Sequence, residues 1–191
     1  MPDMTRWKPN RHFLRTAIPR PLDSWLLDTA SLTLRLQQLC TGEFRVRVLS
    51  QVTGRPRLDE ARALDMKPDA LAIIRQVQLL CDGKPWVYAR TIIPLTSLRG
   101  RLRRLAHLGS RPLGGMLFAD PGMRREIVEL ACIRKGHDMY ATATRRLTRK
   151  PDCVWGRRAV FRIARKPLLV SEVFLPAFPA RTATAPLWKS R

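Results

Sequence analysis

Two arginines interrupt an apolar pattern in residues 73–93. Asp82-Gly83 lies between two apolar, β-branched runs and predicts a two-residue β-turn. Counting back from that turn places Arg75 directly opposite Arg90, on a face that is otherwise apolar. Like charges opposite each other destabilise a sheet, and each buried ion costs several kcal/mol. The guanidinium group binds carboxylates with two parallel hydrogen bonds, so this pattern predicts an anion between the two side chains.

Residues 153–179 place charges in the same way. A turn at Ala164-Arg165 would set Arg157 opposite Glu172, within a row of apolar side chains. Two interpretations stay open: the two side chains neutralise each other, or Glu172 faces a ligand. The arginine pair of the first segment has an alternative too, because a different register or contact with solvent at the sheet edge would remove the conflict. A site with two arginines and one glutamate on an apolar face would suit a small, largely apolar acid that also carries a hydroxyl group.

The composition indicates one folded domain with anionic partners. The chain has 191 residues, of which 45% are hydrophobic, enough for a core of its own. Lys and Arg number 36 against 15 Asp and Glu, a formal net charge of +21. Nucleic acid, an anionic membrane surface and a small anionic substrate are all compatible with that charge. The alternative is a solvated basic surface that reflects a genome rich in Arg codons.

The cysteines and histidines do not predict a metal site. The chain has no CxxC motif, and its histidines do not cluster with its four widely spaced cysteines, Cys40, Cys81, Cys132 and Cys153. We expect four reduced thiols, no metal and no cofactor. The N-terminus lacks the apolar core of a secretory signal, and no apolar run reaches the roughly 20 residues that span a bilayer. A cytoplasmic protein without stable membrane insertion is expected.

The order of helical and strand patterns along the sequence predicts an α+β fold that positions these residues. Apolar residues recur at helical spacing after Asp23, and residues 43–51 alternate as a half-buried strand. The full prediction is a helix over 24–40, a strand over 43–51, a hairpin over 71–93, a basic helix over 95–109 closed by Gly109, two helical pieces within 123–150 broken near Gly136, and a hairpin over 153–179. This order indicates an antiparallel sheet covered on one side by helices. Residues 1–20 are interpreted as a loose basic arm, 21–179 as the domain and 180–191 as a tail.

Three motifs carry a resemblance to a known family. The segments "LLCDGKPWVYARTIIP", "RPLGGMLF" and "WGRRAVFRIARKPLLVSEVFLP" together resemble the chorismate pyruvate-lyases, in the order in which that family has them. The resemblance covers about residues 20–179. It implies a single highly twisted antiparallel sheet with helices on one side and helical flaps over an enclosed ligand.

The resemblance also implies an activity and a set of site residues. Enzymes of this family convert chorismate to 4-hydroxybenzoate and pyruvate, the first committed step toward the ubiquinone ring, without a metal or a redox step. The family pattern implies that Arg75 binds a substrate carboxylate and that Leu113 offers its backbone to the ligand. It implies that Glu172 contacts the hydroxyl side of the ring, that Leu32 is a flap residue lining the pocket and that Arg90 is a second pocket arginine. Arg75, Arg90 and Glu172 are therefore the predicted catalytic residues.

The sequence departs from the family pattern at several positions, but none of these departures removes a charged pocket residue. Ala89 stands where a glycine often precedes the second arginine, which would narrow the pocket, and Arg165 replaces a turn glycine. These departures put the kinetics in doubt more than the activity.

Two other functions compete with the lyase. Effector-binding domains of GntR-type regulators resemble this fold, so a non-catalytic domain that senses a small aromatic acid is the alternative. The residues before Pro21 are too few for the winged helix–turn–helix that such domains normally follow. A nucleic-acid-binding protein would explain the charge, but no zinc finger, RNP-like strand or recognition helix is evident. We expect a monomer that binds chorismate and 4-hydroxybenzoate and no nucleic acid.

Overall fold

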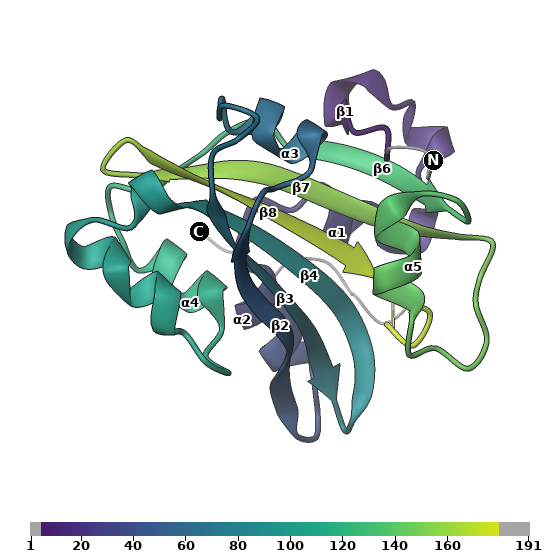
Figure 1. Cartoon of the computed structure of the whole chain (residues 1–191). Helices are drawn as coiled ribbons and strands as arrows, with labels where there is room; N and C mark the ends of the chain where they lie inside the picture. The colour runs from purple at the N-terminus through teal and green to yellow at the C-terminus, as the bar shows by residue number, and fades with distance from the viewer. Residues whose placement is uncertain (1–4, 180–191) are drawn as a thin grey trace, which may run out of the picture.

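A single twisted antiparallel sheet of eight strands forms the centre of the molecule (Figure 1). The structure is a computed structural model that describes residues 5–179. Across the sheet the strands follow the order β1 (Lys8–Pro9), β6 (Glu129–Arg134), β7 (Cys153–Ile163), β8 (Lys166–Phe174), β4 (Lys84–Pro94), β3 (Ala72–Cys81) and β2 (Phe44–Gly54), and β5 (Arg124–Arg125) also pairs with β7. The α+β fold with one antiparallel sheet is the one predicted from the sequence.

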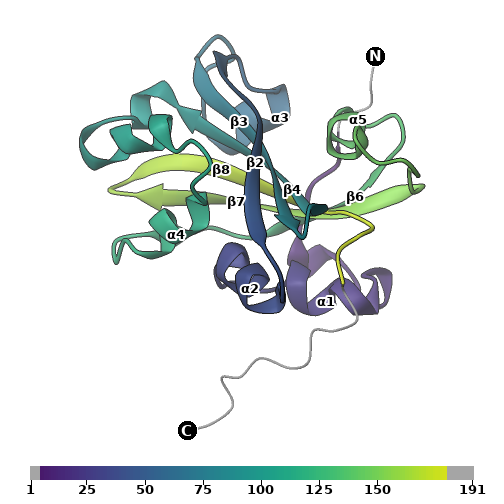
Figure 2. The same ribbon diagram turned by 90° about the horizontal axis from the view of Figure 1, so that it is seen from below.

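Helices cover the two faces of the sheet unequally. The α-helices are α1 (Arg20–Leu26), α2 (Leu32–Leu39), α3 (Leu58–Ala63), α4 (Leu113–Phe118) and α5 (Asp138–Thr144), and the 3-10 helices are η1 (Asn10–His12), η2 (Arg15–Ala17), η3 (Leu95–Ser97) and η4 (Gly100–His107). Figure 2 shows α1 and α2 on one side of the sheet and α3 and α5 on the other. The main core joins α1, α2, η4 and α4 to the first side. The sequence predicted helices on one side alone, so α3 and α5 on the other side depart from that prediction. The other side carries two smaller cores, one with α5 and one beside α3.

The helical segments differ from the prediction: α3 and α4 were not expected, and the helix over 95–109 is the pair of 3-10 helices η3 and η4. The helix expected over 24–40 is divided into α1 and α2, because the Ser31 hydroxyl accepts the Leu34 N–H at 3.5 Å and starts a new helix. The helical piece expected before Gly136 is the strand β6, and only α5, after Gly136, is helical. Leu130 and Ile133 are three residues apart, a spacing typical of one face of a helix. In the strand β6 they point to opposite faces of the sheet, and both are buried because both faces are covered. A strand buried on both faces lacks the alternation that would have identified it.

The two hairpins test the predicted registers. In the second hairpin Arg157 pairs with Glu172 across β7 and β8, which confirms the predicted register. In the first hairpin the turn is also confirmed, with positive φ at Asp82 (48°) and Gly83 (74°). The register nevertheless shifts between Leu79 and Leu80, because Trp86 is an extra residue in β4 that forms a bulge.

The bulge reverses the face of every later residue in β4. Arg75 pairs with Thr91, and Arg90 pairs with Gln76. Successive side chains of a strand point to opposite faces, so Arg75 and Arg90 lie on opposite sides of the sheet. The predicted contact between the two arginines is therefore wrong.

The N-terminal segment is part of the fold as far as the structure describes it. Lys8 pairs with Leu130 at one edge of the sheet, and Ile18 is buried in the main core. The Arg158 guanidinium lies 5.0 Å from the centre of the Trp7 ring. Residues 5–20 are thus not the loose arm that was predicted, whereas residues 1–4 and the predicted tail 180–191 lie outside the described residues. Within residues 5–179 no helix is long and apolar enough to cross a membrane.

A disulfide joins Cys40, the residue that caps the C-terminal end of α2, to Cys81 at the end of β3. The prediction of four reduced thiols is therefore corrected: only Cys132 and Cys153 are free. Sequence spacing could not reveal the bond, because the two cysteines are 41 residues apart and meet only through the fold.

The disulfide predicts a defined response to reductant. Closing a loop of 41 residues should stabilise the fold by about 4 kcal/mol through the entropy of the unfolded chain. Reduction should lower the melting temperature by roughly 10 °C. Cys40→Ser should abolish the effect of reductant, and the matched variant Cys132→Ser should keep it. Four titratable thiols in protein that is denatured without reductant would contradict the bond.

Candidate active site

One cavity lies between the first side of the sheet and the helices α2 and α4. Its empty volume, counted with its mouth and the solvent space there, is about 560 Å³. Its charged walls are Arg75, Arg125, Arg157 and Glu172. Most other lining residues are apolar, among them Val77, Leu79, Ala89 and Phe161. A small acid with an apolar body would match this lining.

Arg75 is a buried cation without a carboxylate partner. It projects from β3, and 2% of its surface is exposed. One guanidinium nitrogen, Nη2, donates to the carbonyl oxygens of Gly109 at 2.9 Å and Arg111 at 3.2 Å, while the buried Nε has no partner. Desolvation lowers the pKa of Arg75, and no ion pair found within residues 5–179 includes it. An anion in the cavity would supply the missing charge.

Glu172 both forms an ion pair and lines the cavity. Its Oε2 accepts a hydrogen bond from Arg157 Nε at 2.7 Å, so the pairing considered from the sequence exists. Arg157 Nη1 also donates to the carbonyls of Trp25 at 2.6 Å and Asp28 at 2.7 Å. The Glu172 side chain keeps 18% of its surface exposed toward the cavity, and its Oε1 has no hydrogen-bond partner among the described residues. Arg157 therefore holds Glu172 in place and leaves one carboxylate oxygen free for a ligand.

Arg125 is a third guanidinium of the cavity. It lies on β5 opposite Phe161 of β7, and its guanidinium carbon is 5.3 Å from the centre of that ring. Nη1 donates to the Asp28 carbonyl at 3.1 Å, and the buried Nε has no partner. Desolvation, followed by repulsion from Arg157, lowers the pKa of Arg125 to about 10, so it stays a cation at neutral pH.

Leu32 and Leu113 belong to the helical cover of the cavity. Leu32 is the first residue of α2 and Leu113 the first of α4, and both line the cavity. The two helices contact each other closely at Gly114. A Cβ atom there would lie 3.0 Å from Thr33 Oγ1 and 3.1 Å from Ser31 Oγ, so a larger residue would push the helices apart. The "RPLGG" motif thus brings α4 against α2 above the sheet.

Arg90 lies outside the cavity. The bulge at Trp86 turns it to the other side of the sheet, where it binds Glu60 of α3 with two hydrogen bonds, Nε–Oε1 at 2.6 Å and Nη2–Oε2 at 2.9 Å. Glu60 is 1% exposed, and its Oε2 also accepts the Arg57 N–H at 2.9 Å. The prediction of Arg90 as a pocket residue is therefore corrected: it forms a buried structural ion pair.

Four of the five predicted site residues meet in one cavity: Leu32, Arg75, Leu113 and Glu172. The sequence predicts Arg157 only as a partner of Glu172, although the same register places it in the row that lines the cavity. Arg125 was missed entirely, because residues 123–135 were interpreted as a helix. The β-branched residues Ile127, Val128 and Ile133 nearby were a signal that favoured a strand over a helix, although no alternation marks the two residues of β5.

Comparisons with known proteins identify relatives of this chain. The family model described as "Chorismate lyase" matches residues 1–183. The chain is 42% identical over 156 residues to "Probable chorismate pyruvate-lyase" of Methylococcus capsulatus, covering 82% of this chain and 95% of that protein. It is 44% identical over 167 residues to the protein of the same name from Azoarcus sp., covering 85% and 87%. The chain belongs to the chorismate lyase family.

Solved structures of low sequence identity share the fold of this chorismate lyase family member. The C-terminal domain of the histidine utilization repressor from Pseudomonas syringae pv. tomato matches with a TM-score of 0.53 at 9% identity, covering 78% of this chain and all (100%) of that one. A GntR-family transcriptional regulator from Bacillus cereus matches with a TM-score of 0.54 at 13% identity, covering 75% and 100%. The family member therefore shares its fold with domains of transcriptional regulators.

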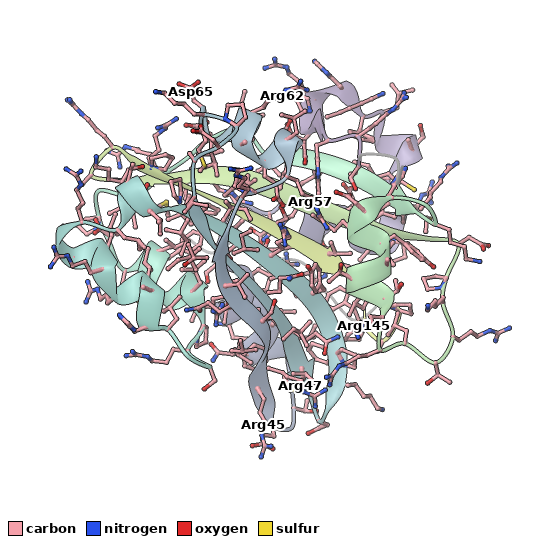
Figure 3. The ribbon with its side chains drawn as sticks, viewed as in Figure 1. Arg45, Arg47, Arg57, Arg62, Asp65 and Arg145 are labelled. Carbon is pink, nitrogen blue, oxygen red and sulfur yellow. A yellow bond between two sulfur atoms is a disulfide. The ribbon has the colours of Figure 1, made fainter. Side chains whose placement is uncertain are left out.

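The buried pair predicts that Arg90 serves stability. Arg90→Leu should reduce the free energy of unfolding by about 3–5 kcal/mol, because it leaves the Glu60 carboxylate buried without a cation. Urea denaturation would measure this loss. Arg62→Leu, on the exposed surface of α3 (Figure 3), is the matched control and should change stability by about 0.5 kcal/mol or less.

A double variant tests whether the loss of stability comes from the unpaired charge of Glu60 or from the loss of the Arg90 side chain itself. Glu60→Leu with Arg90→Leu should regain most of the lost stability, because no charge is then stranded. Turnover per folded molecule should stay within a few-fold of the wild type in Arg90→Leu. If Arg90→Leu has normal stability but loses turnover, Arg90 acts in the active site and not in a structural ion pair.

Proposed function

We propose that the protein converts chorismate to 4-hydroxybenzoate and pyruvate. Chorismate carries a ring carboxylate, a hydroxyl at C4 and an enolpyruvyl ether at C3 with a second carboxylate. The observation that carries the proposal is an apolar cavity in which two arginines, Arg75 and Arg125, lack a carboxylate partner and face a glutamate with one free oxygen. The family membership and the names of the relatives support the same reaction.

The chemistry asks little of the protein beyond positioning. The bond between C3 and the ether oxygen breaks and C4 loses its hydrogen, so the ring becomes aromatic and supplies the driving force. The ether electrons leave with the enolpyruvyl group, and the hydrogen ends on its methylene carbon, which gives pyruvate. This balance needs no oxidant or reductant. The protein must hold the substrate in a reactive conformation, exclude water and stabilise the charge that develops on the departing oxygen.

The residues of the cavity suit these tasks. Arg75 binds the ring carboxylate through its unpartnered nitrogen, at the wall opposite Glu172. Leu32 and Leu113 cover the ring from above, and the backbone of Leu113 adds a contact to the ligand, as the family resemblance implies. A cavity roofed by apolar residues keeps water away and strengthens the charged contacts inside it.

Glu172 acts on the hydroxyl side of the ring. Its free Oε1 accepts a hydrogen bond from the C4 hydroxyl, while Arg157 fixes the carboxylate through Oε2. Two routes for the C4 hydrogen follow from this placement. Glu172 removes it as a general base, or it passes directly to the enolpyruvyl group while Glu172 only orients the hydroxyl.

The oligomeric state, the use of the product and the cellular compartment are also part of the proposed function. The working unit in this proposal is a monomer, as expected from the sequence. The proposed product is the precursor of the ubiquinone ring, and the compartment is the cytoplasm, as the sequence predicted. No role for nucleic acid is included.

Turnover of chorismate is the decisive test. Purified protein is mixed with chorismate, and 4-hydroxybenzoate and pyruvate are followed separately. Both products should appear in equal amounts, with chelator present as well as with added Mg²⁺. Tight binding of 4-hydroxybenzoate without any turnover would favour the alternative, a sensor domain of the same fold.

Glu172→Gln separates catalysis from folding. The amide keeps the shape and one acceptor for Arg157 but loses the negative charge, so turnover should fall by about 100-fold or more. The free energy of unfolding should fall by much less than the roughly 3–5 kcal/mol of a broken buried pair. Denaturant curves and turnover rates measured on the same samples would decide. Near-normal turnover in a strongly destabilised variant would leave Glu172 with a structural role only.

A further inference from the structure

The charges of the cavity do not balance. Arg75, Arg125 and Arg157 bring three positive charges and Glu172 one negative charge, which leaves a formal charge of +2. Arg157 and Glu172 neutralise each other at 2.7 Å. The excess therefore resides on two separate side chains, Arg75 and Arg125. A dianion would match this charge, whereas a monoanion would leave one cation uncompensated.

Arg125 has no carboxylate of its own within residues 5–179. The acidic groups that act on it are Glu172 and Asp28. Glu172 is engaged by Arg157, and the Asp28 carboxylate binds Arg35 at 2.9 Å. The direct partners of Arg125 are a main-chain carbonyl and an aromatic ring, and its Nε is buried without a partner. Such a cation is costly to bury unless a ligand completes its shell.

The strand order separates the three charged groups across the sheet. Arg75 lies on β3, Glu172 on β8 and Arg125 on β5, at the far side of β7. Strand β4 separates β3 from β8, and Arg75 is level with Val170, two residues before Glu172. Two strand spacings of about 4.8 Å and an offset of about 7 Å along the strand place the backbones of Arg75 and Glu172 roughly 12 Å apart. Arg125 and Arg157 both donate to the Asp28 carbonyl, at 3.1 and 2.7 Å. Arg125 is thus at the Glu172 end of the cavity, away from Arg75.

Chorismate has the same order of groups. Its ring carboxylate is at C1, and the C4 hydroxyl and the C3 enolpyruvyl ether are neighbours at the opposite end of the ring. We propose that Arg125 binds the carboxylate of the enolpyruvyl group, while Arg75 holds the ring carboxylate and Glu172 the hydroxyl. This assignment rests on the proposed lyase function and deepens it, because it gives each of the two carboxylates its own arginine.

The assignment has a consequence for the products. The enolpyruvyl carboxylate leaves the ring with pyruvate, so 4-hydroxybenzoate has no group for Arg125. Arg125 also borders a separate open hollow on the α3 side of the sheet, together with Asp59, Arg62 and Arg158.

The test compares substrate with product in Arg125→Gln. The kcat/KM for chorismate should fall by about 100-fold, because a desolvated charge pair is lost. The Kd of 4-hydroxybenzoate, measured by titration calorimetry, should stay within about threefold of the wild type, because that ligand never meets Arg125. Pyruvate should inhibit the wild type competitively and the variant more weakly. Arg125→Lys should restore part of kcat/KM, since it keeps the charge but loses the planar fork.

Matched variants make the outcome specific. Arg124→Gln, on the exposed neighbouring residue of β5, should change neither measurement. Arg75→Gln should weaken both chorismate turnover and 4-hydroxybenzoate binding. Unchanged chorismate kinetics in Arg125→Gln, or an equal loss of product binding, would overturn the assignment. A wild-type protein that forms no product would instead refute the lyase function. If Arg125→Gln does not fold, the same comparison in Arg125→Lys decides: KM for chorismate must rise while product affinity is kept.

Discussion

Two arginine side chains are taken out of water on opposite faces of one sheet, and only one of them receives a carboxylate from the protein. Arg90 is matched by Glu60, itself 1% exposed, whereas Arg75 at 2% exposure finds only carbonyl oxygens. Burying an unpaired ion costs several kcal/mol, so the fold must offset that cost elsewhere. Extensive apolar burial around the cavity does so, and the unpaired charge is kept for a ligand. The remaining features of the site follow from holding this charge in a closed space.

The cover of the cavity is fixed by close contacts at its centre and by a covalent bond at one end. Gly114 lets α4 approach Ser31 and Thr33 at the start of α2. The bond between Cys40 and Cys81 ties the other end of α2 to β3, the strand that carries Arg75. The roof and Arg75 are therefore linked through a single strand, which limits how far they can separate.

The sequence predicted the fold and most of the cavity because local patterns were strong there. The two-residue turn assumed at Ala164-Arg165 gave the correct register and the pairing of Arg157 with Glu172, although neither residue favours the positive φ that both adopt there. The same reasoning failed for Arg90, since one extra residue, Trp86, reverses the face of everything after it and no turn signal marks a bulge. The disulfide, like the position of Arg125 beside Phe161, depends on contacts between distant segments that periodicity does not encode.

The division of charge in the cavity also bears on how one fold can serve both sensors and a lyase. A sensor needs only to bind its ligand, and one unpaired cation in an apolar cavity is enough for a small acid. A lyase must bind the transition state more tightly than the substrate or the product. When the ether bond breaks, negative charge moves onto the departing oxygen, at the end of the cavity where Arg125 and Arg157 lie. After cleavage the dianion has become two monoanions, and the ring product keeps its contact with Arg75 alone. The second arginine would thus favour the substrate and the breaking bond over the aromatic product, which a binding site with Arg75 alone could not do.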